Sequence, residues 1–400
     1  MKSSRTSSIW RQIPRGVWAL GFVSLLMDIS SEMIHALLPA YLVVGLGASM
    51  LTVGVIEGVA EATAAITKVF SGALSDWLGK RKALAAIGYG LAAFTKPVFP
   101  LAPTVAWLAA ARFVDRVGKG IRGAPRDALV AEISPPHLRG ASFGLRQSLD
   151  TVGAFLGPLL AVGLMWLFAN DFTLVFWVAV VPAFLSFFLV LFAVHEPSRA
   201  AALRKVHMPL SRPELARLGT AYWWIVAVSA LFTLARFSEA FLILRALSAG
   251  MPTMLLPVVL VIMNVAYALS AYPAGALSDR FDRVTILIIG LLLLIVADVT
   301  LAFAPGLVGV VIGVALWGIH MGFTQGLLAT LIADAAPPEL RGTAFGVFHL
   351  VTGVALLLAS VVAGVLWESI GPRGTFLAGA VFALLTVPGL LLVRSRRLSS

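Results

Sequence analysis

The feature that most constrains this chain is a succession of long apolar runs. Each run can cross a bilayer as a helix, which takes about 20 consecutive apolar residues. The predicted spans are residues 18–44, 51–75, 83–102, 104–122, 143–167, 173–194, 219–246, 253–277, 284–304, 306–331, 344–368 and 374–393. Hydrophobic residues make up 60% of the chain and charged residues 12%, whereas soluble domains average about 50% and about 25%. The sequence therefore predicts an all-α polytopic membrane protein with twelve transmembrane helices.

Lysine and arginine gather in the predicted loops on one side of these spans. That side holds Lys80, Arg81, Lys82, Arg126, Arg139, Arg280, Arg283, Arg341, Arg394, Arg396 and Arg397. The opposite loops hold little more than Arg373. Because cytoplasmic loops are enriched in these residues, we expect both termini in the cytoplasm. The formal charge of +11 is then a topological bias, and no nucleic-acid partner is expected.

The composition also indicates where the protein resides. Arginine outnumbers lysine, and alanine and glycine are abundant, which is typical of a GC-rich bacterial genome. The N-terminus has no small-residue cleavage pattern after a short apolar core, so we expect an uncleaved first span. The chain has no cysteine, which excludes disulfides, thiolate metal sites and a thiol nucleophile. The prediction is a multi-pass protein of a bacterial inner membrane.

The two halves of the chain repeat each other. Gly72–Asp76 recurs word for word as Gly275–Asp279, and Pro135–Gly140 resembles Pro337–Gly342. Between the halves lies a charged, proline-containing segment, residues 195–218. We therefore predict two six-helix bundles, residues 1–194 and 219–400, joined by a cytoplasmic linker. Parallel repeats of this kind place the substrate path between the halves, near the membrane midplane.

Twelve spans in two repeats, with the loop motif Gly72-Ala-Leu-Ser-Asp76-Trp-Leu-Gly79-Lys80-Arg81-Lys82, resemble the major facilitator superfamily (MFS) of secondary transporters. The resemblance covers the whole chain and implies the MFS fold. It implies a transporter rather than an enzyme, no cofactor, and a monomer that meets a small molecule or ion, protons and the lipid bilayer. It also implies a cytoplasmic gate at Gly72, Asp76, Gly79, Lys80, Arg81, Asp279 and Arg280.

The fifth predicted span carries glycines at a regular spacing. Gly144, Gly153, Gly157 and Pro158 resemble the antiporter signature of proton-coupled drug exporters in this superfamily. The family pattern continues with a glycine pair, where this chain has alanine and valine. Glycines at this spacing allow helices to approach closely, and a proline bends its helix. The pattern favours export by antiport, and ordinary helix packing is the alternative.

Charged residues share one face of the fourth span. Arg112, Asp115, Arg116 and Lys119 recur at i, i+3, i+4 and i+7, so they line one side of a helix. Inside a membrane such a face must line a cavity or pair with other groups. Arg112 matches a position where many proton-coupled members of the superfamily keep an arginine. The alternatives for the cationic residues beyond it are lipid headgroup contacts and local ion pairs.

Acidic residues occur in the first two spans. Asp28, Glu32 and His35 share a helix face, and Glu57 and Glu61 lie one turn apart. Such acids suit proton coupling, because a desolvated carboxylate can load and release a proton as access alternates. They also suit a divalent metal, for which Asp28, Glu32 and His35 would be the ligands. Structural ion pairs are the third interpretation.

The remaining candidates lie in the fifth and seventh spans. Arg146 and Asp150 are one turn apart, and Arg236 and Glu239 mirror the acidic motif of the first span. The cavity candidates are therefore Asp28, Glu32, Glu57, Glu61, Arg112, Asp115, Arg146, Asp150, Arg236 and Glu239.

These residues lead to one favoured function and several alternatives. The favoured function is proton-coupled efflux of a small organic molecule, and the alternatives are divalent metal export and uptake of an organic anion or phosphate. A channel would need a repeated filter segment, and an enzyme would need a nucleophile or metal motif. The sequence shows neither.

Overall fold

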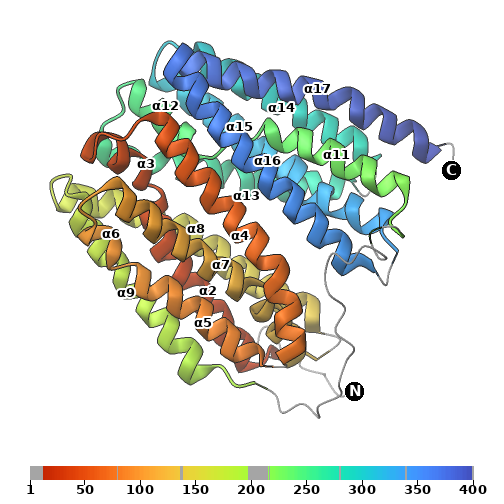
Figure 1. Cartoon of the computed structure of the whole chain (residues 1–400), viewed down its shortest axis with the longest axis horizontal. Coiled ribbons are helices and arrows are strands. Elements are labelled where there is room, and N and C mark those ends of the chain that lie inside the picture. Colours follow the sequence, from red (N-terminus) through yellow and green to blue (C-terminus); the bar gives the residue numbers. More distant parts are fainter. Residues whose placement is uncertain are drawn as a thin grey trace, which may run out of the picture.

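The computed structural model describes residues 12–78, 80–135, 138–196, 215, 217–278, 281–337 and 340–398. The described part of the first half is helical, with α2 (Arg15–His35), α3 (Leu38–Ala40), the π-helix η1 (Tyr41–Gly45), α4 (Met50–Leu78), α5 (Arg81–Thr95), α6 (Val98–Leu101), α7 (Val105–Ile133), α8 (Arg139–Leu167) and α9 (Phe172–Ala193). The second half contains α11 (Thr220–Leu234), α12 (Ala240–Ser248), the 3₁₀-helix η3 (Thr253–Leu255), α13 (Val258–Ser278), α14 (Arg283–Phe303), α15 (Leu307–Ala335), α16 (Arg341–Ile370) and α17 (Pro372–Leu398). Figure 1 shows the two halves as separate bundles.

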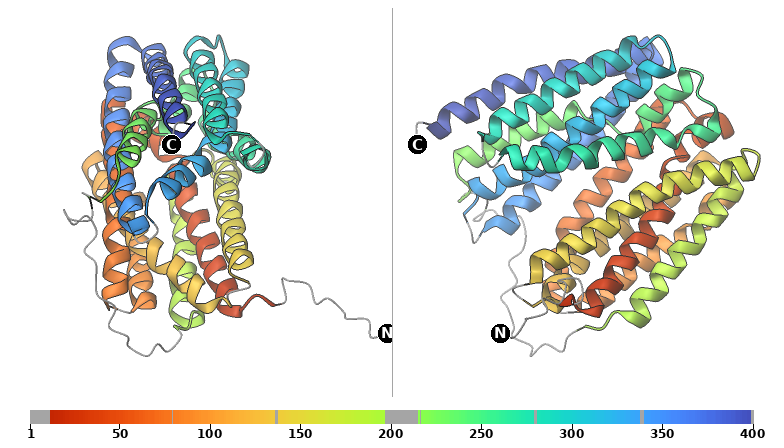
Figure 2. Two further views of the ribbon diagram at one scale, coloured as in Figure 1. Left: turned by 90° about the vertical axis from the view of Figure 1, so that its right-hand side faces the viewer. Right: turned by 180° about the vertical axis from the view of Figure 1, so that it is seen from behind.

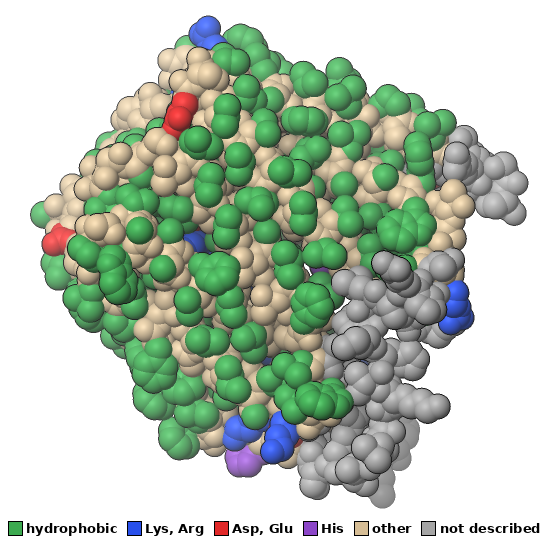
Figure 3. All heavy atoms as spheres, in the orientation of Figure 1, with side chains coloured by type: hydrophobic (Ala, Val, Ile, Leu, Met, Phe, Trp, Pro, Cys, Tyr) green, Lys and Arg blue, Asp and Glu red, His purple; other side chains and the backbone are tan. Residues whose placement is uncertain are grey.

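The predicted twelve-helix architecture is confirmed. Among the described residues, ten helices are long and apolar enough to cross a membrane. The other two crossings are α7, which carries the row of charges, and α11 with α12, which are separated by a break. In Figure 3 hydrophobic side chains are spread over the whole visible face, and most of the few Lys and Arg side chains lie at its edges. This surface is suited to lipid rather than to water.

We call the end of the bundle with Arg15, Lys80, Arg139 and Arg283 the cationic end, and the opposite end the distal end. The halves diverge toward the cationic end in Figures 1 and 2. At the distal end the halves meet. The Leu51 amide donates to the Glu368 carboxylate at 2.8 Å, and Thr253 donates to Asn170 at 3.3 Å.

One contact between the halves, which we call the seam, extends from the distal end far along the molecule toward the cationic end. Along it, glycines of α4 and α16 bring the two backbones together. A Cβ on Gly364 would lie 2.7 Å from the Leu51 Cα, and one on Gly58 would lie 3.1 Å from the Leu357 Cα. Farther along, a Cβ on Gly353 would meet Ala65 at 3.0 Å. A larger side chain would not fit at these glycines. The close approach that they allow keeps α4 and α16, and with them the two halves, in contact on one side of the molecule.

The single helix predicted over 219–246 is wrong, because α11 ends at Leu234 and α12 begins at Ala240. We call residues 235–239 the break. They contain no proline or glycine, so the sequence does not indicate that the helix ends there. Serine side chains accept hydrogen bonds from backbone amides in and next to the break. The Ser238 amide donates to Ser360 Oγ at 3.2 Å, and Ser238 Oγ accepts from the Ala240 amide at 3.2 Å. Irregular backbone at membrane depth requires such internal partners.

Two other predicted elements differ from the structure. The first span, predicted as 18–44, is helical from Arg15 to His35 and continues through α3 and η1. The fourth span, predicted to end at 122, runs to Ile133 with Pro125 inside the helix.

Most of the predicted linker lies outside the described residues, but its beginning is attached to the first half. The carboxylate of Glu196 accepts from the backbone amides of Arg81 at 2.6 Å and Lys82 at 3.3 Å. These amides belong to the first turn of α5, where backbone donors lack partners within the helix.

Candidate functional site

A cavity lies between the halves and extends from the break toward the cationic end. It consists of two adjoining pockets of about 340 Å³ and about 490 Å³. Both are lined by Glu32, Glu61 and Lys119 of the first half and by Thr233, Arg236 and Leu356 of the second. This size is suited to a small organic molecule. The structure thus places the polar helix faces of both halves around one space, as the repeat predicted.

The first wall of the cavity is a network of ion pairs between α4 and α7. Arg112 and Glu57 form its innermost pair at 2.8 Å, with each side chain 1% exposed. His35 lies 3.7 Å from Glu57 and 3.3 Å from Glu32. Because Arg112 and His35 both contact Glu57, the Glu57 carboxylate is held in place and is shut off from solvent.

The same face of α7 makes two further pairs. Asp115 accepts from Lys96, the residue after the end of α5, at 2.9 Å, and Lys96 also donates to Ser31 at 3.1 Å. Arg116 lies 3.5 Å from Glu61, whose side chain is 30% exposed. The i, i+3, i+4, i+7 spacing therefore does position these side chains together, but most of their charges are neutralised inside the first half.

A second group of charges lies between α7 and α8. Asp150 is 3.5 Å from Arg146 and 3.7 Å from Arg126, and Arg126 also contacts Asp127 at 3.1 Å. The carboxyl group of Asp28 on α2 interacts directly with that of Asp150. Asp28, Asp150 and Arg126 all line the larger pocket, so this group faces the cavity.

Two glycines of α8 position the acidic turns of α2. A Cβ on Gly153 would lie 2.7 Å from the Leu25 carbonyl and 2.9 Å from the Asp28 Cβ. A Cβ on Gly157 would lie 2.7 Å from the Glu32 Cβ. The close approach predicted for these glycines is therefore present, whereas Gly144 has no neighbour within 4 Å. Pro158 follows within the same helix.

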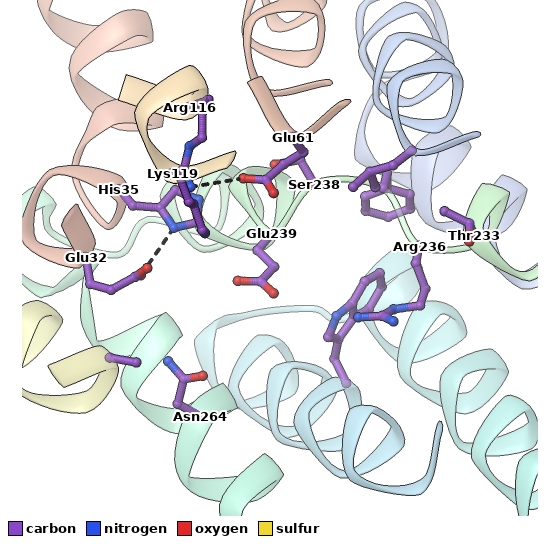
Figure 4. A pocket seen from close by; sticks show the side chains of 14 residues that line it. Glu32, His35, Glu61, Arg116, Lys119, Thr233, Arg236, Ser238, Glu239 and Asn264 are labelled. Carbon is purple, nitrogen blue, oxygen red and sulfur yellow. Dashed lines mark hydrogen bonds and ion pairs between the residues drawn. The ribbon is translucent and has the colours of Figure 1, made fainter. Parts of the chain in front are cut away.

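The second wall is formed by the break and by α13 and α15. Figure 4 shows Glu239 pointing into the pocket between the charges of the first half and Arg236 and Asn264 of the second. The guanidinium of Arg236 lies 5.8 Å from the Phe232 ring. Within the described part of the chain Glu239 forms no ion pair, and neither does Lys119. The second wall with Glu239, and α7 across the cavity with Lys119, therefore offer charges that are not neutralised by ion pairs among the described residues.

The predicted gate residues can be followed only in part. The side chain of Asp76 and the residues Gly79, Asp279 and Arg280 lie outside what the structure describes. A Cβ on Gly72 would contact Ala124 at 3.4 Å, and Lys80 is exposed. Arg81 lies 2.6 Å from Glu132 on α7, so in this conformation it binds within its own half. In the second half Arg283 does the same with Asp334, at 2.5 Å.

The metal alternative receives no geometric support. Among the described residues, no three acidic or histidine side chains are arranged to hold a metal ion. Asp28 faces Asp150, whereas Glu32 faces His35. Two of the three residues proposed as ligands therefore pair with each other, and Asp28 pairs with a different residue.

Sequence reasoning left some cavity residues unassigned. Asn264 and Trp317 line the smaller pocket, and Lys68, Gln325 and His349 line the larger one. An isolated polar residue in an apolar span is a sequence signal for such a position. Only the packing of the helices shows which of these residues reach the cavity.

The sequence matches the profile described as Major Facilitator Superfamily over residues 20–265 and 250–400. The chain is also 34% identical over 391 residues to an uncharacterized MFS-type transporter of Methanocaldococcus jannaschii, covering 96% of this chain and 95% of the relative. The chain belongs to the major facilitator superfamily. An uncharacterized protein of Mycobacterium tuberculosis is 30% identical over 363 residues, which is 89% of this chain and 88% of that protein. As a member of this family, the chain is a secondary transporter and not an enzyme.

Solved structures share the same fold. The nucleoside transporter NupG has a TM-score of 0.80 at 14% identity, covering 94% of this chain and 99% of its own. A bacterial homolog of the human lysosomal transporter Spinster, in an inward-facing and unoccupied conformation, has a TM-score of 0.75 at 16% identity, covering 97% of each chain. At these identities the likeness concerns the fold alone.

Proposed function

We propose that this MFS transporter exports a small organic molecule in exchange for protons. The observation that carries the proposal is Glu239, an acidic side chain at the break that points into the cavity. It has no ion pair among the described residues. A carboxylate so placed can bind a proton or a cationic group of the substrate, and the two can compete for it.

The paired acids divide into two groups under this proposal. Glu57 and Asp115 are held by buried cations at 2.8 and 2.9 Å and act as structural members of the wall. Asp28, Glu32 and Glu61 border the cavity, so water can reach them. Together with Glu239 they form the set from which protons are exchanged.

The proposed orientation is consistent with export. With the cationic end in the cytoplasm, as the positive-inside bias indicates, the cavity in this conformation receives substrate from the cytoplasm. The glycines at 153 and 157 resemble those of drug antiporters. In addition, the multidrug resistance protein MdtH of Photorhabdus laumondii is 29% identical over 168 residues, 40% of this chain. These points support efflux across a bacterial inner membrane, by a monomer with two units, 1–194 and 219–400.

A transport assay tests the proposal. The purified protein is reconstituted in liposomes, and the movement of ethidium, an organic cation, is followed after a pH jump. We expect ethidium to accumulate on the more acidic side, and the Glu239→Gln variant to lose this accumulation. A collapsed gradient in the same vesicles serves as the control. Ethidium movement by the wild type that ignores the gradient would contradict proton coupling.

A second function has support from the same cavity. Lys119 and Arg236 both line the two pockets, and neither forms an ion pair within the described residues. Two such cations can bind a carboxylate or phosphate group of an organic anion. Under this alternative, the Lys119→Gln and Arg236→Gln variants abolish transport of an anionic dye, whereas Glu239→Gln retains it.

A further inference from the structure

A buried carboxyl group lies in the second half, outside the cavity lining. It belongs to Asp298 on α14, which is 0% exposed. Within the described part of the chain, neither carboxyl oxygen of Asp298 has a hydrogen-bond partner. Asp298 contributes to none of the pockets that form the cavity, so it is not one of the acids already considered.

The surroundings of Asp298 join α14 to the break and to α17. A Cβ on Gly379 would lie 2.6 Å from Asp298 Oδ2, 3.1 Å from the Phe237 ring and 3.3 Å from the Ala235 carbonyl oxygen. The Asp298 carboxyl and the carbonyl of Ala235, which follows the last residue of α11, therefore both border the space next to Gly379. Carbonyls at the end of a helix lack donors within their own helix.

Aromatic rings separate this carboxyl from the cavity. Phe237 contacts Trp317, Phe376 and Phe241, with ring centroids 5.3 to 5.6 Å apart. Phe237 and Trp317 also line the smaller pocket. Phe237 and Trp317 thus border the cavity, and the Phe237 ring also borders the space next to Gly379 that the Asp298 carboxyl borders.

The titratable groups on the neighbouring elements form no ion pair with Asp298 among the described residues. Arg245 of α12 donates to the Leu301 and Ala304 carbonyls at 2.8 and 2.9 Å, and the Arg373 guanidinium of α17 stacks on Phe303 at 5.6 Å. Arg236 and Glu239 face the cavity. His320 of α15 contacts the Trp317 and Phe232 rings.

An ionised carboxylate in such a place would be a buried charge without compensation, which is strongly unfavourable. A protonated carboxyl avoids this cost, because it is neutral and its O–H can donate to a carbonyl oxygen. The break offers a route for exchange. If residues 235–239 rearrange, water from the cavity reaches the carboxyl and Arg236 can approach it.

We propose that Asp298 is a second proton-exchanging site of this transporter, protonated in the present conformation and deprotonated when the break rearranges. The step moves one proton from a carboxyl oxygen to cavity water and leaves a carboxylate that Arg236 can neutralise. This inference rests on the proposed proton coupling, to which it adds a site in the half with fewer charges.

Infrared difference spectroscopy between acidic and alkaline buffer tests the site without any substrate. We expect the wild type in lipid to show the carbonyl stretch of a protonated carboxylic acid, and the Asp298→Asn variant to lack part of it. Asp171→Asn, which removes an exposed carboxyl at the start of α9, should leave the band unchanged. Gly379→Ala retains the carboxyl but crowds it, and should shift the band.

Ethidium transport by the same variants then tests the coupling. Asp298→Asn should retain exchange of ethidium between vesicle compartments of equal pH and lose accumulation driven by a pH gradient. An Asp298→Asn spectrum identical to that of the wild type would overturn the inference, and so would full gradient-driven accumulation by this variant. Failure of the wild type to respond to the gradient would instead remove the proposed proton coupling, while the infrared band still reports on Asp298.

Discussion

The two walls of the cavity have the same repeat origin but different chemistry. In the first half, buried acids and bases pair with each other, as Glu57 does with Arg112 and Asp115 with Lys96. In the second half, aromatic rings around Phe237 fill the corresponding interior. Among the described residues, Arg236 and Glu239 of the break and Lys119 of α7 line the smaller pocket without an ion pair. We infer that the buried ion pairs of the first half supply a rigid polar frame, and that the groups that respond are those that border the cavity, in both halves.

The largest effect should come from breaking the innermost ion pair of the first half. Arg112→Leu leaves Glu57 without its strongest partner, and an uncompensated buried charge costs about 3–5 kcal/mol of unfolding free energy. The measurement is thermal unfolding in detergent, followed by tryptophan fluorescence. The double variant Arg112→Leu/Glu57→Leu should recover much of the loss. If the single variant is as stable as the wild type, the frame does not depend on this pair.

A smaller effect should distinguish two pairs at equivalent positions of the repeat. Arg81–Glu132 is mostly buried, with side chains 10% and 17% exposed, whereas Arg283–Asp334 is 37% and 44% exposed. Glu132→Gln should lower the unfolding free energy by about 1–3 kcal/mol, because it weakens a buried charged contact. Asp334→Asn should cost at most about 1 kcal/mol. Equal losses in denaturation would contradict the difference between the halves.

A further prediction concerns the helix approach that positions the acids. Gly157→Ala places a Cβ against Glu32 and the Ile29 carbonyl, at 2.7 and 2.9 Å, and such overpacking costs about 1–3 kcal/mol. Gly144→Ala is the matched control. Its Cβ meets nothing within 4 Å, and alanine favours the helix by up to about 1 kcal/mol. Thermal unfolding should rank Gly157→Ala below the wild type and Gly144→Ala at or above it.

The smallest effect is expected at the distal end. Glu368→Gln removes the negative charge that accepts from the Leu51 amide at the start of α4, where a helix favours an anion. Because Glu368 is exposed, the variant should shift the balance between conformations rather than unfold the protein. Spin labels on cysteines introduced at Val44 and Ile370, which are both exposed, would report the distal distance between the halves. An unchanged distance distribution would show that this contact does not help to close that end.

The sequence predicted the fold better than the site. Apolar run lengths and the duplicated motif at Gly72 and Gly275 are local signals, and they were sufficient for twelve helices in two repeats. The break was not predictable, because the serine that satisfies it, Ser360, is 122 residues from Ser238. For the same reason the sequence could not separate Glu57, which is neutralised, from Glu239. Which acid finds a cation depends on contacts between helices.

The burial of the short helix α12 should make the equilibrium between the two access states depend on temperature. Its residues from Ala240 to Ala246 are all buried, and a Cβ on Gly54 of the other half would lie 3.2 Å from the Phe241 ring. When the halves separate at the distal end, part of this apolar helix must meet water. Exposure of apolar surface raises the heat capacity, so the equilibrium between the two access states should vary with temperature along a curve rather than a straight van't Hoff line. A transport rate measured at one temperature could then not be extrapolated linearly to another temperature.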